Sequence, residues 1–298
     1  MSLACSRSYC VLPSVQNLSL PLMFFWNRSL IAAAGLWLAA CASAPTQVPT
    51  QTLGPFQYAP DSSSSKTTYT VHRPKDAQRR PGVLLIHGGG WSDGEPEDLQ
   101  RYAERVVAAG WVAINMGYRL APDHLWPAQR EDLLAIQADL HARATELGLD
   151  SSRIAVLGYS AGAHLAAQAA LAPNPRVPPP VALIGGAGPY DLTRYADSRI
   201  VRTFLGGVPA AVGAQTYRDA SPLFKVSPAA PPTYLWHGTW DTLVGLDQSR
   251  DLARALQAAG VEVVLKERFG RGHITNFLLD DEAWEEIRVF IAEAFASP

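Results

Sequence analysis

The sequence predicts an α/β fold whose central sheet is mostly parallel and is covered by helices on both faces. From about residue 67 to the end of the chain, short apolar runs alternate with longer stretches of helical periodicity. Most of these runs are apolar on both faces, which indicates strands buried between two layers of helices. The length of 298 residues, nearly half of them hydrophobic, suits one large domain with a substantial core.

Each strand and helix follows from its own pattern. The segment at 67–74, TTYTVHRP, alternates like a strand, and the later apolar runs are short and bounded by turn residues or helices. The strands expected are 67–74, 83–87, 111–118, 153–158, 181–186, 233–238 and 261–269. The helices expected are 98–110, 128–148, 161–172, 246–260 and 281–296.

One segment interrupts the alternation of strands and helices. Residues 187–232 are rich in Pro, Gly and Ala and include a short helical stretch, DSRIVRTFLGG. In open parallel sheets, ligands bind beyond the carboxyl ends of the strands. We therefore expect 187–232 to be a short, lid-like insertion over such a site within a domain that spans 67–298.

The charge and composition exclude several classes of function. The formal net charge of −2 gives no basic surface of the kind that binds nucleic acid, so no nucleic-acid partner is expected. Neither internal repeats nor the Cys and His spacing of a metal site is present in the sequence, so no metal is expected.

The N-terminus has the pattern of an export signal. An apolar run from Leu30 to Ala40 follows a short cationic segment; it is too short to cross a bilayer but suits a secretory signal. Its ending, LAAC, resembles a bacterial lipoprotein box, which implies a signal peptide over 1–40 and a lipid on Cys41. A plain signal peptide cleaved nearby is the alternative, and Met23 would be a more ordinary start for either.

The segment after Cys41 is expected to be a tether. Pro, Ser, Thr and Gln dominate 42–66, and periodic apolar spacing is absent. The three cysteines, Cys5, Cys10 and Cys41, all lie at or before the expected cleavage point. The resemblance implies a lipid-anchored protein of the bacterial cell envelope, and the absence of Asp at residues 42 and 43 favours the outer membrane.

A serine between glycines follows the strand expected at 153–158. In GYSAG, Gly158 and Gly162 flank Ser160 at the positions where a sharp strand-to-helix turn needs small residues. The following helix would present the N–H of Ala161 to developing negative charge. Taken alone, the pattern fits a nucleophile elbow and an ordinary strand-to-helix junction equally well.

Three further motifs also follow strands. HGGGW at 87–91 could turn the N–H groups of Gly88 and Gly89 toward an oxyanion, and it lacks the ending of a phosphate loop. Asp241 follows the strand at 233–238, and His273 follows the strand at 261–269. A serine nucleophile needs a base, and an imidazole base needs a carboxylate to fix its tautomer. The coincidence of all four motifs at strand ends favours catalysis.

Together these motifs resemble one enzyme family. HGGGW, GYRLAP, GYSAGAHLA, GPYDL, ASPLFKVS, HGTWDTLV and GRGH occur in the order found in α/β-hydrolases of the carboxylesterase group, which includes hormone-sensitive-lipase-like esterases and relatives of feruloyl and acetyl-xylan esterases. The resemblance covers about 67–298. It implies Ser160 as nucleophile, His273 as base and Asp241 as its orienting acid, with the N–H groups of Gly88, Gly89 and Ala161 as the oxyanion hole.

The resemblance predicts a serine carboxylic-ester hydrolase that acts on short-chain or aryl esters through an acyl-enzyme, with a small-molecule ester as partner and no cofactor. An amide hydrolase, either an arylformamidase or a small serine peptidase, is the alternative. A catalytically dead binding module of the envelope is a third possibility. We expect His87 to orient the glycine loop and His164 to be packed, with no role in the chemistry.

Overall fold

The computed structural model of the chain describes residues 49–59, 64, 66–76 and 78–297. The strands are β1 (Thr50–Gln57), β2 (Thr68–Pro74), β3 (Arg80–Ile86), β4 (Val112–Met116), β5 (Leu149–Tyr159), β6 (Ala182–Gly186), β7 (Thr233–Gly238) and β8 (Val263–Arg268). The α-helices are α1 (Gln100–Ala108), α2 (Ala128–Ala142), α3 (Ala144–Leu147), α4 (Ala161–Leu171), α5 (Arg199–Leu205), α6 (Pro209–Val212), α7 (Ala214–Asp219), α8 (Asp247–Ala258), α9 (His273–Leu278) and α10 (Asp281–Ala296). Short 3₁₀ helices are η1 (Pro96–Leu99), η2 (Leu192–Tyr195) and η3 (Pro222–Lys225).

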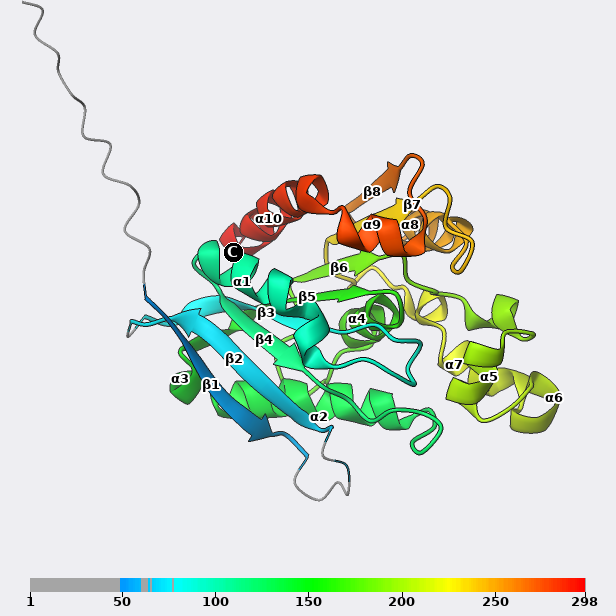
Figure 1. Cartoon of the computed structure of the whole chain (residues 1–298), viewed down its shortest axis with the longest axis horizontal. Helices are drawn as coiled ribbons and strands as arrows, with labels where there is room; N and C mark the ends of the chain where they lie inside the picture. Colours follow the sequence, from blue (N-terminus) through cyan, green and yellow to red (C-terminus); the bar gives the residue numbers. More distant parts are fainter. Residues whose placement is uncertain (1–48, 60–63, 65, 77, 298) are drawn as a thin grey trace, which may run out of the picture. The chain divides into compact units, whose positions relative to one another are not determined.

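The strands form one sheet in the order β1-β2-β4-β3-β5-β6-β7-β8 (Figure 1). Every pair from β4 to β8 is parallel, whereas β2 runs antiparallel to both of its neighbours. The mostly parallel sheet expected from the sequence is therefore confirmed. Parallel pairing places the carboxyl ends of β3, β5, β6, β7 and β8 along one edge, which is where the sequence motifs lie.

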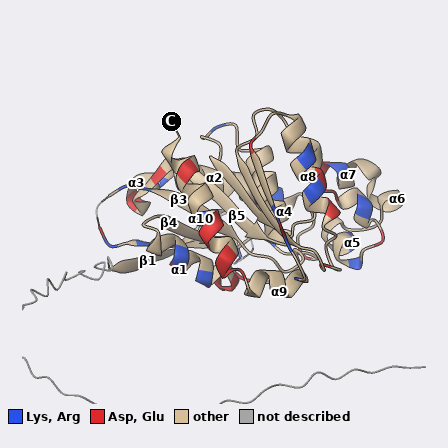
Figure 2. Ribbon diagram, turned by 90° about the horizontal axis from the view of Figure 1, so that it is seen from above, with Lys and Arg blue, Asp and Glu red and all other residues tan. Residues whose placement is uncertain are grey.

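Helices cover both faces of this sheet, as expected. One face packs against α2, α4 and α8 through residues such as Leu133, Leu165 and Leu252. The other face packs against α1 and α10 through residues such as Val106 and Ile287 (Figure 1). Figure 2 shows Lys, Arg, Asp and Glu interspersed along the outer helices α1, α8 and α10. The apolar strands between the two helical layers form the core.

The domain begins earlier than the sequence predicts. We expected a tether over 41–66 and ordered structure from Thr67, but β1 occupies Thr50–Gln57 and pairs antiparallel with β2. Its sequence, TQTLGPFQ, is polar and contains Gly54 and Pro55, so it lacks the signature of a strand. An edge strand tolerates such residues because one of its sides needs no backbone partner. The predicted tether is therefore wrong over residues 50–57.

The helix expected at 128–148 is divided in two. Helix α2 ends at Ala142, and Arg143 then leaves the helical region. Helix α3 ends at Leu147 and is followed by Gly148 in the left-handed conformation, with φ of 62°. A glycine there removes the steric cost of that backbone conformation. The chain can then turn directly into β5, whose far end carries the serine motif.

The insertion at 187–232 contains η2, α5, α6, α7 and η3. The insertion packs against α4, since Phe204 and Tyr217 belong to the same core cluster as the residues of that helix. No helix among the described residues is long and apolar enough to cross a membrane. The predicted signal peptide over 1–40 and the predicted lipidation of Cys41 lie outside the described residues.

Candidate active site

Ser160 lies on a sharp turn between β5 and α4. Its backbone has φ of 56° and ψ of −123°, a conformation that a non-glycine residue adopts at a cost of about 1–3 kcal/mol. The flanking glycines make the turn possible. A Cβ added to Gly158 would lie 2.2 Å from the carbonyl oxygen of Gly162, and one added to Gly162 would lie 2.0 Å from that of Ile86. The nucleophile-elbow pattern therefore reflects the absence of space on both sides of the serine.

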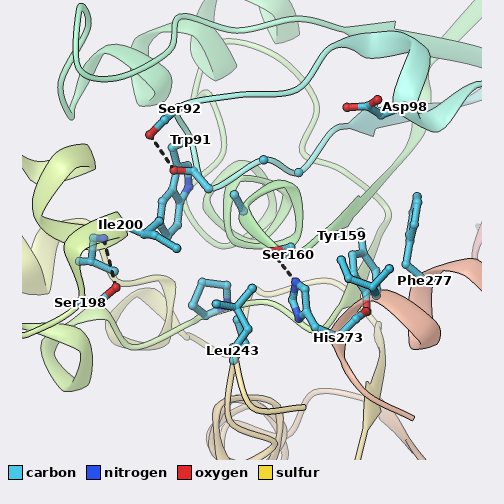
Figure 3. A pocket seen from close by; sticks show the side chains of 18 of the residues that line it. Trp91, Ser92, Asp98, Tyr159, Ser160, Ser198, Ile200, Leu243, His273 and Phe277 are labelled. Atoms are coloured by element: carbon cyan, nitrogen blue, oxygen red, sulfur yellow. Dashed lines mark hydrogen bonds between the residues drawn. The ribbon is translucent and has the colours of Figure 1, made fainter. Parts of the chain in front are cut away.

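The structure brings together the three residues that the sequence places on separate loops, and Figure 3 shows two of them, Ser160 and His273. The Oγ atom of Ser160 lies 2.9 Å from Nε2 of His273, and Nδ1 of His273 lies 2.7 Å from Oδ2 of Asp241. With a proton on Nδ1, His273 donates to the carboxylate and accepts from the serine hydroxyl. This is the tautomer that a general base needs.

Asp241 is held by more than one partner. Its side chain is buried, and its Oδ1 accepts hydrogen bonds from the N–H groups of Leu243 at 3.0 Å and Val244 at 2.9 Å. Burial alone would raise the pKa of Asp241, but hydrogen bonds from His237, His273 and the N–H of Val244 outweigh it and hold this pKa well below its usual range. Asp241 is therefore a carboxylate throughout the neutral range and can stabilise a cationic His273.

His237 is a buried partner of Asp241 for which sequence reasoning found no role. Its Nε2 lies 3.2 Å from Oδ2 of Asp241 and 2.9 Å from the carbonyl oxygen of Val244, so this nitrogen must carry a proton. Its Nδ1 accepts from the hydroxyl of Ser249 at 2.8 Å. The separation of four residues in HGTWD is the only sequence signal of this contact, and it is weak across a strand-to-loop boundary.

Tyr159 holds the backbone of the histidine loop. Its hydroxyl donates to the carbonyl oxygen of His273 at 2.6 Å and accepts from the side-chain amide of Asn276 at 3.2 Å. Asn276 follows His273 on α9, so both ends of the first turn of that helix are tied to the elbow. This contact joins residues more than a hundred positions apart and leaves no local signature in the sequence.

The glycine loop after β3 passes beside Ser160. A Cβ on Gly88 would lie 3.6 Å from Cβ of Ser160, and Gly89 has φ of 99°. Within the described part of the chain, the N–H groups of Gly88, Gly89 and Ala161 have no protein acceptor, and all three residues line the pocket around Ser160. These are donors that an oxyanion next to Ser160 could use.

His87 and Tyr118 hold this loop from behind. Nδ1 of His87 donates to the carbonyl oxygen of Gly88 at 2.8 Å, and the hydroxyl of Tyr118 lies 3.1 Å from the same oxygen. The two rings stack at 4.3 Å. Because a peptide carbonyl and the next N–H point in opposite directions, fixing the carbonyl of Gly88 directs the N–H of Gly89 to the other side of the chain. His87 contacts the loop as the sequence predicts.

A pocket of about 520 Å³ surrounds Ser160 and His273. Its walls are mostly apolar and come from the glycine loop, α9, the loop after β7 and the insertion (Figure 3). The insertion contributes Tyr195, Ser198, Ile200 and Val201. Among the described residues, no group of three or more His, Cys, Asp or Glu side chains is placed to hold a metal ion. The arrangement suits acyl transfer at an uncharged substrate.

Comparison with known proteins agrees with this geometry. Residues 70–256 match the BD-FAE family. The probable carboxylic ester hydrolase LipM of Mycobacterium tuberculosis is 30% identical over 89% of this chain and 69% of its own length. Esterase LipC of the same organism is 33% identical over 68% of this chain and 55% of its own length.

A solved structure shows the same fold. The thermophilic esterase Est2 of Thermogutta terrifontis, with butyrate bound, superposes with a TM-score of 0.67 at 25% identity over 78% of this chain and 91% of its own. The chain therefore belongs to the BD-FAE family and is a carboxylesterase-type serine hydrolase with the α/β-hydrolase fold.

Proposed function

We propose that this enzyme hydrolyses short-chain or aryl carboxylic esters, with Ser160 as nucleophile, His273 as general base and Asp241 as the residue that orients and stabilises His273. The observation that carries the proposal is the continuous set of hydrogen bonds from Asp241 through His273 to Ser160, which ends at the floor of a mostly apolar pocket. A nucleophile, its base and the base's partner are thus within hydrogen-bonding distance of one another.

The proposed reaction has two halves. In the first, His273 takes the proton of Ser160 as Oγ attacks the ester carbonyl carbon, and the carbonyl oxygen becomes an oxyanion that accepts from the N–H groups of Gly88, Gly89 and Ala161. Collapse of this intermediate breaks the bond to the alkoxy oxygen, which receives the proton from His273. In the second half, His273 takes a proton from water as its oxygen attacks the acyl carbon. The bond from that carbon to Oγ of Ser160 then breaks, Oγ receives the proton from His273, and the carboxylic acid leaves.

The pocket supports the proposed substrate class. Its volume of about 520 Å³ lies in the range of small-molecule sites and leaves room for a short acyl chain or one aromatic ring with its alcohol. The structural relative Est2 holds butyrate, a four-carbon acyl group. The lining disfavours an anionic acyl group, because among the described residues no Lys or Arg lines the pocket and such a group would lose its hydration without gaining a cationic partner.

The proposal is tested by kinetics on a panel of p-nitrophenyl esters from acetyl to octanoyl, with feruloyl esters alongside. We expect the highest kcat/KM among the short-chain or aryl esters and a fall in kcat of about 10⁴-fold or more in Ser160→Ala. Near-normal ester hydrolysis by that variant would overturn the nucleophile assignment. Faster turnover of an N-formyl anilide or a peptide anilide than of every ester would favour the amide hydrolase instead.

We also propose that Cys41 carries a lipid that anchors the enzyme in the bacterial envelope, at the outer membrane. The support is the sequence alone: the apolar run ending in LAAC, followed by Ala42 and Ser43. Radiolabelled palmitate should enter the wild-type protein and be absent from Cys41→Ser. Equal labelling of the two proteins would contradict the anchor.

A further inference from the structure

We propose that His164 is a positioning residue: through Trp91 it ties the glycine loop beside Ser160 to the insertion that lines the pocket. The proposal rests on the proposed function of Ser160 and its neighbours. His164 lies on α4, one helical turn after the nucleophile, and is completely buried. The reaction scheme gives it no role, yet both of its ring nitrogens have partners on other segments.

The partners of His164 fix its tautomer. The indole Nε1 of Trp91 can only donate a hydrogen bond, and it lies 3.1 Å from Nδ1 of His164, so this nitrogen must be the acceptor. The proton of the neutral ring is therefore on Nε2, which donates to the carbonyl oxygen of Ala220 at 2.6 Å. The imidazole thus receives a hydrogen bond from the glycine loop and gives one to the insertion.

Trp91 needs such support because its backbone is in an unfavourable conformation. It follows Gly89 and Gly90 and has φ of 60°, which places it in the left-handed region that side chains rarely adopt. Its ring stacks on Phe204 of α5 at 4.4 Å with an angle of 11° between the planes, and meets His164 edge-on at 5.1 Å. The stack and the indole hydrogen bond hold the end of the glycine loop in place.

This arrangement links three parts of the site. Trp91 lines the pocket (Figure 3) and continues the loop that carries the N–H groups of Gly88 and Gly89. Phe204 and Ala220 belong to the insertion. His164 itself is anchored on the same helix as the nucleophile. Removing its two hydrogen bonds should let the loop shift relative to Ser160, and small displacements of oxyanion donors lower kcat steeply.

The test compares His164→Leu, Trp91→Phe and the double variant with the wild type on p-nitrophenyl acetate. Fluorophosphonate titration of Ser160 normalises each rate to the number of competent sites, so that loss of folded protein does not count. We expect His164→Leu to lower kcat about tenfold or more with a much smaller change in KM. The double variant should be no more than about threefold slower than the slower single variant, because both changes break the same link.

Two further variants complete the design. His164→Gln keeps one acceptor and one donor and should recover most of the kcat lost in His164→Leu. His141→Leu, which alters an exposed histidine on α2, is the matched control and should match the wild type. The link would be overturned by an unchanged kcat in His164→Leu. It would also be overturned if the fold-loss in kcat of the double variant equalled the product of the two single losses. If the fluorophosphonate leaves wild-type Ser160 unlabelled, the proposed function itself fails, which is a separate result.

Discussion

The pocket has two parts that are built in different ways. The loops after β3, β5, β7 and β8 supply the glycine loop, Ser160, Asp241 and His273. The first three of these strands end buried, whereas β8 is a partly exposed edge strand. The facing wall comes from the insertion, where short helices place Tyr195, Ser198, Ile200 and Val201 (Figure 3). The strand-end part contains the groups that could carry out the chemistry, whereas the insertion contributes shape.

The difference suggests a division of labour. Strand ends are fixed by the sheet, so side chains there can be held to the tolerance that proton transfer requires. Besides its connections to the sheet, the insertion packs against α4, stacks Phe204 on Trp91 and pairs Arg194 with Asp251 of α8. Among the described residues it makes no hydrogen bond to Ser160, Asp241 or His273, so it can differ without removing the hydrogen bonds that join these three. Changes in the strand-end part should therefore act on kcat, and changes in the insertion should act on the choice of acyl group.

The largest effect is expected in the strand-end part. Asp241→Asn keeps the shape of the side chain but removes the charge that stabilises a cationic His273 and selects its tautomer. We expect kcat for p-nitrophenyl acetate to fall by about 10⁴-fold. A loss of less than about tenfold would show that Asp241 does not orient the base.

A glycine at the elbow should be the next most sensitive position. Gly162→Ala places a methyl group 2.0 Å from the carbonyl oxygen of Ile86. The clash can be relieved only by moving the backbone of α4 or of β3. We expect a loss of about 3 kcal/mol in unfolding free energy, measured by urea denaturation. Gly260→Ala is the control, since its methyl group meets no atom within 4 Å and only the φ of 81° opposes it, at about 1 kcal/mol. Equal losses in the two variants would contradict the close approach.

The link between the two parts should show in the pH dependence of stability. Burial lowers the pKa of His164 from 6.5 to about 4. As the pH falls below 6.5, His164 becomes protonated in the unfolded chain, whereas in the folded protein it stays neutral down to about pH 4. The free energy of unfolding therefore decreases between pH 6.5 and pH 4, by about 3 kcal/mol. His164→Gln lacks this contribution. Urea denaturation at pH 7 and pH 4 should show that the wild type loses about 3 kcal/mol more unfolding free energy than His164→Gln between the two pH values. Equal losses in the two proteins would contradict this prediction.

The smallest effect is expected in the insertion. Ile200 lines the pocket from α5 and is 41% exposed. Ile200→Ala should raise KM for a hexanoyl ester about threefold, through the loss of apolar contact, and leave kcat for the acetyl ester unchanged. Val289→Ala, which shortens an exposed side chain on α10, serves as the control. A large fall in kcat for the acetyl ester would show that the insertion takes part in the chemistry.

The positions of the strand-end residues could be predicted from the sequence, because each motif joins a reactive residue type to a recognisable strand or turn pattern. Ser160 lies between glycines that the turn requires, Asp241 follows the apolar strand β7, and His273 follows β8, an edge strand whose pattern is apolar only in its first half. In a parallel sheet such positions converge at one edge, so linear order is enough to bring them together.

What the sequence could not predict depends on contacts between distant segments. Strand β1 is polar and is defined by its pairing with β2, not by its own pattern. The contacts from His237 to Asp241 and from Tyr159 to the backbone of His273 follow from side-chain directions that no spacing rule encodes. The second of these contacts ties the turn at Ser160 to the loop that carries His273.

The central claim is that Ser160 forms a covalent acyl-enzyme. Its most direct test is peptide mass spectrometry of the protein quenched with acid during turnover of a slow aryl ester, with a fluorophosphonate adduct as reference. We predict one acyl group per chain, located on the peptide that contains Ser160 and absent from Ser160→Ala. Continued hydrolysis with no adduct at Ser160, or an adduct on another residue, would contradict the account.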